Sequence, residues 1–243
     1  WTGVTCNSCT TESYCTILSL ALPFQNLQGT IPDSIGDISN ITTLDLSFNY
    51  GMVGVIPTQV GKLTALTEFN ILDNLITGSV PMEIGNMSAL VLLECGGNML
   101  ISSLPSTVYS LTNLEVFNFH DNSLTGSIPS DIGNLQALTL LWVTSNSLQG
   151  SIPPTINSLS RLVVLHLDLN SFEGTLPSNM GGLTQLTLLS VESNMLNGTV
   201  PSSISAITSN LKSINLGSNR FTGLVFDTLF YTDPSSTNST NTL

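Results

Sequence analysis

Hydrophobic and polar residues follow one another in a pattern that recurs at a nearly constant interval along this chain. Each unit reads Leu-x-x-Leu-x-Leu-x-x-Asn-x-Leu-x-Gly-x-Ile-Pro, then x-x-Ile-Gly-x-Leu before the next unit. A fixed period over almost the whole chain predicts a solenoid, whose units bury their apolar faces against their neighbours. The asparagine position recurs every 24 residues, with two intervals of 25, at Gln25, Asn49, Asn74, Asn98, Asn122, Asn146, Asn170, Asn194 and Asn219.

The order of residues within a unit predicts its elements. The Leu-x-Leu alternation has a period of two and predicts a short strand with leucines inward, so strands of successive units stack in parallel. A buried Asn amide suits the following turn because it can both donate to and accept from unpaired backbone groups. Proline then begins a convex segment too short for a full helix. The pattern predicts an α/β solenoid of nine repeats of about 24 residues, with a concave parallel sheet and convex helical or 3-10 turns.

In each unit except one, a glycine stands at the Gly position of the Asn-x-Leu-x-Gly step. Its freedom to adopt positive φ allows the tight bend after the strand. The one departure from this pattern is Ser102.

The extent of the repeat pattern divides the chain into three segments. Residues 17–226 form the solenoid, and residues 1–16 precede it with Cys6, Cys9 and Cys15, candidates for a disulfide-stapled cap. A zinc site there would need a fourth ligand, which the segment lacks. Cys95 occupies an inward leucine position and is expected to be a small buried hydrophobe. Residues 227–243 are rich in Ser, Thr and Asn and read as a flexible stalk or linker.

Composition narrows the classes of partner. The formal charge is -12, with four Lys and Arg against sixteen Asp and Glu. This balance repels phosphate backbones, so nucleic acid is excluded and a cationic or neutral ligand is favoured. Polar residues interrupt every apolar run before the roughly 18 residues that a membrane span needs, so no transmembrane helix is expected.

Alternate strand residues face outward, so the sequence lists the concave surface as three columns. The first column is Ser19, Thr43, Glu68, Leu92, Val116, Leu140, Val164, Leu188 and Ser213. The second is Ala21, Asp45, Asn70, Glu94, Asn118, Trp142, His166, Ser190 and Asn215. The third is Pro23, Ser47, Leu72, Gly96, His120, Thr144, Asp168, Glu192 and Gly217.

An aromatic residue stands midway along this trough. Trp142 neighbours Asn118 and His166 in the second column and lies one column from His120 and Asp168. An exposed aromatic ring on a polar surface is a natural anchor for a sugar ring or a ligand side chain. The alternative is an indole lying flat against the apolar first column, with no ligand.

Acidic residues form the second feature of the trough. Asp168 and Glu192 should be lateral neighbours, and two like charges so close raise one pKa or attract a cation. With His166 they could be read as a catalytic cluster or a Ca²⁺ site, but we expect no enzyme, cofactor or metal, because no nucleophile, oxyanion hole or metal motif accompanies them. We expect an acidic binding face, which also includes Glu94. His120 and His166 could make binding pH-dependent.

Four Asn-x-Ser/Thr sequons fit a secreted glycoprotein. They begin at Asn40, Asn86, Asn197 and Asn238, and the first three are expected on the convex or lateral side, away from the trough.

The Leu-x-Gly-x-Ile-Pro segments, with Trp1-Thr-Gly-Val-Thr-Cys6 ahead of them, resemble the plant-type leucine-rich repeat family over residues 1–226. That family includes ectodomains of receptor kinases and receptor-like proteins, and polygalacturonase-inhibiting proteins. The resemblance implies a right-handed, extracellular, non-catalytic recognition module that binds a peptide, protein or glycan on its concave face. One alternative is a secreted inhibitor of a cell-wall-degrading enzyme. Another is a structural or adhesive protein that contacts a polysaccharide, mineral or ice surface.

Overall fold

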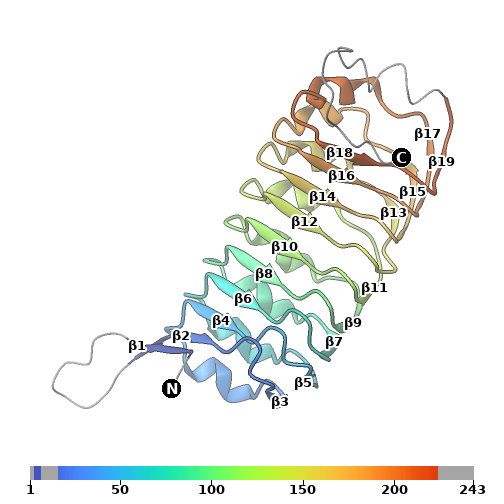
Figure 1. Ribbon diagram of the computed structural model, residues 1–243. Coiled ribbons are helices and arrows are strands. Elements are labelled where there is room, and N and C mark those ends of the chain that lie inside the picture. The colour runs from blue at the N-terminus through green and yellow to red at the C-terminus, as the bar shows by residue number, and fades with distance from the viewer. Residues whose placement is uncertain (1–2, 7–15, 224–243) are drawn as a thin grey trace.

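The computed structural model describes residues 3–6 and 16–223. These residues form one curved stack of coils, in which every coil adds a strand to the same concave sheet (Figure 1). The predicted solenoid is therefore confirmed. The predicted tail at 227–243 and two of the candidate cap cysteines, Cys9 and Cys15, lie outside the described residues.

The concave sheet has ten strands in the order in which the coils follow along the chain. Its strands pair in parallel, except that β1 pairs with β2 in the antiparallel sense at the N-terminal edge. Equivalent residues of successive coils lie side by side, so Asn118 pairs with Trp142 and Trp142 with His166, as predicted. The strands are β1 (Val4–Cys6), β2 (Ile17–Ala21), β4 (Thr43–Asp45), β6 (Glu68–Asn70), β8 (Leu92–Glu94), β10 (Val116–Asn118), β12 (Leu140–Trp142), β14 (Val164–His166), β16 (Leu188–Ser190) and β18 (Ser213–Asn215).

A second row of short strands runs along one flank of the solenoid, and the sequence pattern did not predict it. These strands follow the asparagine of each coil and pair in parallel with their neighbours, in sheets of two, three and four strands. We call this surface the flank. Its strands are β3 (Gln28–Gly29), β5 (Gly51–Met52), β7 (Thr77–Ser79), β9 (Met99–Ser102), β11 (Ser123–Leu124), β13 (Gln149–Ser151), β15 (Ser171–Thr175), β17 (Met195–Gly198) and β19 (Arg220–Phe221).

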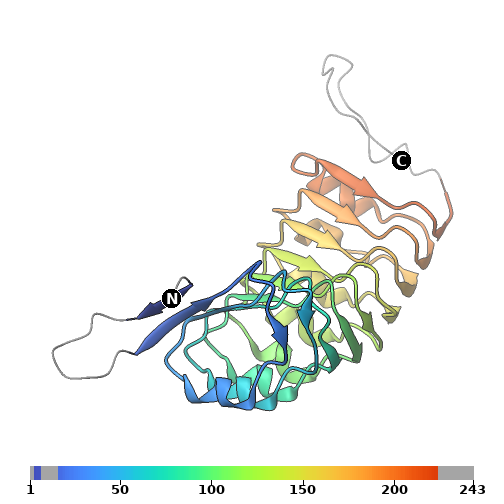
Figure 2. The same cartoon turned by 60° about the horizontal axis from the view of Figure 1, so that its bottom comes forward.

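The convex side consists of short 3-10 turns, which confirms the prediction made from the proline position. In the N-terminal coils these turns lie opposite the concave strands (Figure 2). All but η7 begin directly after a proline, whose fixed φ suits the first position of a turn. The turns are η1 (Asp33–Asp37), η2 (Thr58–Lys62), η3 (Met82–Asn86), η4 (Ser106–Ser110), η5 (Ser130–Asn134), η6 (Pro154–Ser158), η7 (Met180–Gly182) and η8 (Ser202–Ile207).

The predicted asparagine ladder is present and joins each coil to the preceding one. In Asn122, Nδ2 donates to the carbonyls of Cys95, Phe119 and His120 at 3.0, 3.2 and 3.1 Å. Its Oδ1 accepts from the backbone N–H of Leu100 at 2.9 Å. One side chain thus satisfies four backbone groups that the bend leaves unpaired. Gln25 does not reproduce this arrangement, and its amide donates to the carbonyl of Pro23, two residues earlier.

Two positions in each coil adopt a left-handed backbone. The first is the predicted glycine position, where Ser102 also has a φ of 69°. The second, which the sequence pattern did not predict, is the residue just before the ladder position. It includes Phe48 and Asp121, with φ of 56° and 47°. This second bend turns the chain from the concave face onto the flank, and we call the line of these residues the rim.

The core and the N-terminal segment complete the fold. Leucine, isoleucine and phenylalanine side chains from successive coils form one continuous core. Cys95 is fully buried in it, as predicted, and burial raises the pKa of its thiol well above the ordinary value. Cys6, in contrast, is exposed at the end of β1 and has no disulfide partner among residues 3–6 and 16–223.

Candidate functional site

The concave trough has the three columns that the sequence predicted. The strand register aligns the first two columns from coil to coil. Backbone hydrogen bonds beyond the strand ends align the third, as between Asp121 N–H and the Thr144 carbonyl at 2.9 Å and between Ser145 N–H and the Asp168 carbonyl at 3.1 Å. All residues of the three columns are described, and none of them is Lys or Arg.

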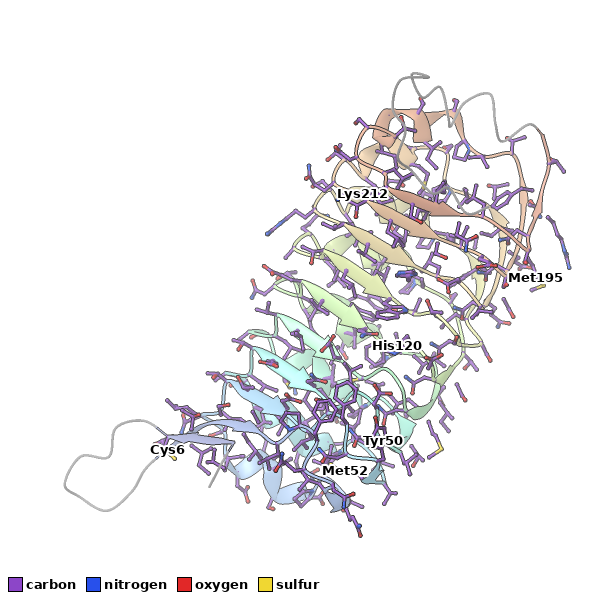
Figure 3. All side chains as sticks on the ribbon, viewed as in Figure 1. Cys6, Tyr50, Met52, His120, Met195 and Lys212 are labelled. Carbon is purple, nitrogen blue, oxygen red and sulfur yellow. The ribbon has the colours of Figure 1, made fainter. Side chains whose placement is uncertain are left out.

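Trp142 lies between two imidazole rings at the middle of the trough. The ring of His120, which follows β10, stacks on the indole with centroids 4.3 Å apart and planes at 16°. The ring of His166, from β14, lies on the other side with centroids 5.4 Å apart and planes at 34°. Figure 3 labels His120 on this face. Trp142 is half-buried, and its indole forms an ordered stack with both imidazole rings.

The indole N–H of this stack lacks a partner. Nε1 of Trp142 is buried and makes no hydrogen bond within the described part of the chain. A buried donor without an acceptor costs on the order of 1–3 kcal/mol. The centre of the trough therefore holds a donor whose hydrogen-bonding capacity is unused.

A chain of polar contacts fixes His120. Its Nδ1 lies 2.7 Å from Oδ1 of Asn118, whose side chain is buried and whose Nδ2 lies 3.5 Å from a carboxylate oxygen of Glu94. Gly96 makes room for the ring, because a Cβ at that position would overlap the imidazole. The absence of a side chain at Gly96 is the sequence signal that could have placed His120 over this neighbour.

Several hydrogen bonds surround the carboxylate of Asp168. One carboxylate oxygen accepts from Oγ1 of Thr144 at 3.1 Å and lies 3.1 Å from Nδ1 of His166. Burial alone would raise its pKa, but hydrogen bonds from His166, its own backbone, Ser190 and Thr144 together lower the pKa below the ordinary value.

The sequence predicted that an Asp168–Glu192 pair would raise one pKa or attract a cation; the pKa of Asp168 itself is lowered. Hydrogen bonds to this carboxylate outweigh the other influences on it. Glu192 hydrogen-bonds instead to Nδ2 of Asn215 in the next coil, at 2.5 Å. Within residues 3–6 and 16–223, no group of three or more His, Cys, Asp and Glu side chains is arranged to hold a metal ion.

A second acidic region occupies the N-terminal half of the trough, and sequence reasoning singled out only its Glu94. Burial raises the pKa of Glu68, and the charge of Asp45 raises it further. Burial also raises the pKa of Glu94; a hydrogen bond from Asn118 lowers it, and Glu68 and Asp45 raise it. The column assignments contained this signal, since Asp45 and Glu94 share the second column and Glu68 lies in the adjacent first column.

Three predicted glycosylation acceptors are exposed outside the trough. Asn40 follows η1 and Asn86 ends η3, both on the convex side, and Asn197 lies in β17 on the flank. Asn238 lies outside the described residues.

Comparisons with known proteins agree with this architecture. A family model described as Leucine Rich Repeat matches residues 113–135 and 210–231. The LRR receptor-like serine/threonine-protein kinase GSO2 of Arabidopsis thaliana is 37% identical over 88 residues, which are 36% of this chain and 6% of that protein.

Solved structures extend the similarity over most of the chain. One is the LRR ectodomain of the plant membrane receptor kinase GASSHO1/SCHENGEN3 from Arabidopsis thaliana, in complex with CASPARIAN STRIP INTEGRITY FACTOR 2. It has a TM-score of 0.78 and 31% identity, covering 93% of this chain and 29% of that one. Another is the plant peptide hormone receptor RGFR1 in complex with RGF2, with a TM-score of 0.67 and 32% identity, covering 81% of this chain and 35% of that one. The chain thus spans about a third or less of these proteins. In its described part, no helix has the length and apolarity to cross a bilayer.

Proposed function

Since the chain is a leucine-rich repeat protein of the plant type, we propose that it is a receptor-like, non-catalytic ectodomain that captures a peptide or protein segment in its concave trough. The proposal assigns ligand contact to Glu94, Asn118, His120, Trp142, His166, Asp168 and Glu192. The similar receptors whose structures contain a peptide hormone or factor support this class of ligand. Exposed sequons at Asn40, Asn86 and Asn197 support an extracellular location.

The aromatic stack is the observation that carries the proposal. Three rings from adjacent coils, those of His120, Trp142 and His166, are held at fixed angles on a hydrogen-bonded sheet. A ligand side chain that packs there loses water against a preorganised surface, and large aromatic residues dominate the energetics of binding sites. The unused N–H of Trp142 adds a polar anchor, because an acceptor on the ligand that displaces one imidazole would satisfy it.

The charge of the trough favours a ligand with basic groups. Carboxylates flank the stack on both sides, with Glu94 toward the N-terminus and Asp168 and Glu192 toward the C-terminus. A groove of one sign attracts ligands of the opposite sign and speeds their association. A cation beside Glu94 would also stabilise the charged form of that buried carboxylate and so lower its raised pKa.

Selection from a random peptide display library, with the full chain as bait, tests the proposal. We expect enriched peptides to combine Lys or Arg with an aromatic or aliphatic side chain. Binding of a selected synthetic peptide should weaken by about tenfold or more in Trp142→Ala, the loss typical of a central anchor residue, and only partly in Trp142→Phe. Binding should also weaken as salt is added.

Matched variants distinguish the loss of a ligand contact from a loss of stability. Glu173→Gln removes an exposed carboxylate from the flank, and it should leave peptide binding unchanged, whereas Glu94→Gln and Glu192→Gln should weaken binding. Unfolding midpoints in urea show whether each variant is folded. If folded Trp142→Ala captures the selected peptides with unaltered affinity, the trough around Trp142 is not the site.

A further inference from the structure

A group of apolar side chains is exposed on the rim and flank of the N-terminal coils, outside the concave trough. Phe24 is 67% exposed, Tyr50 64% and Ile101 49%, which is unusual for such large apolar side chains. Tyr50 is labelled among the N-terminal coils in Figure 3. We call this group the flank patch. It consists of the exposed Phe24, Tyr50, Val53, Val55, Leu75, Met99 and Ile101, with the half-buried Phe48.

The flank patch is contiguous because its residues come from four adjacent coils. The rings of Phe24 and Phe48 stack with centroids 4.3 Å apart and planes at 4°. Val55 bridges to Thr77 of β7, and β7 pairs with β9, which carries Met99 and Ile101. With parallel strands about 4.8 Å apart, four coils span roughly 15 Å along the solenoid.

Folding does not require apolar residues at these positions. In later coils, Ser123 and Ser147 stand at the position of Met99, and Thr125 and Gln149 at that of Ile101. These later coils close with the same ladder and the same left-handed bends. Exposed apolar surface concentrated in one region of a regular repeat indicates a contact surface, whereas a single residue such as Leu169 needs no explanation.

The charges around the flank patch indicate what covers it. Asp73 lies on the rim in the coil after Phe48, and its carboxylate borders Gly97. Asp45, Glu68 and Glu94 lie on the adjoining concave face. Within the described residues 16–111, Lys62 is the only Lys or Arg, and it ends η2 on the convex side. Carboxylates along the concave side of an apolar centre fit a partner that carries positive charge beside its own apolar side chains.

We propose that the flank patch is a docking surface for a protein segment with an apolar centre and flanking Lys or Arg residues, separate from the ligand of the trough. A second copy of this chain fits poorly, because it would bring a net charge of -12 and the same carboxylates against itself. The exposed sequons leave the patch accessible. Asn40 and Asn86 are on the convex side, and Asn197 is on β17, several coils away.

Three synthetic peptides of one length test the proposal by fluorescence anisotropy with the full chain carrying Trp142→Ala, because the intact trough is itself proposed to bind peptides with basic and apolar side chains. The first has Lys and Arg around a Leu- and Phe-containing centre, the second has the same basic flanks around serines, and the third has the apolar centre between glutamates. We expect only the first to bind. Its Kd should rise by about tenfold or more in Tyr50→Ser and Ile101→Ser, as for anchor residues at an interface. Both positions are exposed, and other coils carry polar residues at comparable flank positions, so the variants should fold.

A matched variant locates the effect. Leu169→Ser removes an equally exposed apolar side chain from a distant coil, so it should leave the Kd of the first peptide within about twofold. If the serine peptide binds as tightly as the first, charge alone explains the binding, and no binding of the first peptide would refute the proposal. A Kd that Tyr50→Ser and Ile101→Ser leave unchanged would place the peptide elsewhere than on the flank patch. A dimer in sedimentation velocity that Ile101→Ser abolishes would make the occupant a second copy.

Discussion

The side-chain oxygen of Asn146 accepts a 2.9 Å hydrogen bond from the backbone N–H of Leu124, which belongs to the preceding coil. The nitrogen of the same amide donates to the carbonyls of Phe119, Val143 and Thr144, at 2.9, 3.2 and 3.2 Å. A single side chain therefore holds two coils together through four backbone groups.

Replacing this residue should be costly. Asn146→Ala leaves four partly buried backbone groups unpaired, so we expect the free energy of unfolding to fall by about 3 kcal/mol in urea titrations. Asn113→Ala is the control, because the Asn113 amide makes one exposed bond to the Ser88 carbonyl, and its loss should cost under about 1 kcal/mol. Equal losses in the two variants would show that the ladder does not stabilise the coils specifically.

Ser102 offers a stabilising substitution. It has a φ of 69°, where most other coils have glycine, and a left-handed backbone is unfavourable for a residue with a Cβ. Ser102→Gly should raise the free energy of unfolding by about 0.5–1 kcal/mol.

The reverse exchange is the matched control. In Gly174→Ser the added Cβ meets only Ser151 at 3.6 Å, an ordinary contact, so the backbone alone should lower stability by about 1 kcal/mol. A Ser102→Gly protein less stable than the original would mean that the serine side chain contributes more than the strain costs.

Glu68 and Glu94 predict one pH dependence. The pKa of each is raised in the folded protein by burial and by neighbouring carboxylates, so the folded state binds more protons than the unfolded state between the two pKa values. Stability is therefore full below the unfolded value of about 4.3 and falls as pH rises through the folded pKa. Glu68→Gln and Glu94→Gln should raise the melting temperature at pH 7, and the gain should vanish near pH 4. Glu173→Gln should show no such gain.

Asp168 predicts the opposite dependence of stability on pH. Burial would raise its pKa, but hydrogen bonds lower it overall, so its contribution to stability is present above the unfolded value of about 3.9 and is lost as pH falls through the folded pKa. Asp168→Asn should lower the melting temperature at pH 7. It should also flatten the acid side of the stability profile, as measured by thermal unfolding between pH 2 and pH 7. An unchanged acid profile would contradict the assignment.

Much of the fold could be predicted from the sequence, because its structural signals are periodic. Asn122 and its equivalents mark every coil, and the strand period assigns each side chain to the trough or the core. The flank strands were not predicted, because each has too few residues to show an alternation of hydrophobic and polar positions. The left-handed rim was missed because Phe48, Asp121 and Leu169 share no residue type that would indicate positive φ.

The neighbour relations within the candidate site could be predicted, but the arrangement of its side chains could not. The register placed Trp142 beside His166 and one column from His120. The parallel stacking of two rings and the unpartnered Nε1 depend on side-chain torsions, which a repeat pattern does not contain. The lowered pKa of Asp168 could not be predicted for the same reason, because it depends on hydrogen bonds from Thr144 and His166 that column positions do not reveal.

The asparagine ladder also determines the order in which the coils unfold. Each asparagine amide forms hydrogen bonds with two coils. Unfolding an interior coil therefore breaks hydrogen bonds on both of its faces, whereas unfolding a terminal coil breaks them on one face only. The first coil contributes Gln25 in place of an asparagine and is held to the rest by Asn49, which accepts from the N–H groups of Gln25 and Leu27. Fraying should therefore begin at the ends and travel inward, so that amide hydrogens around Trp142 exchange last.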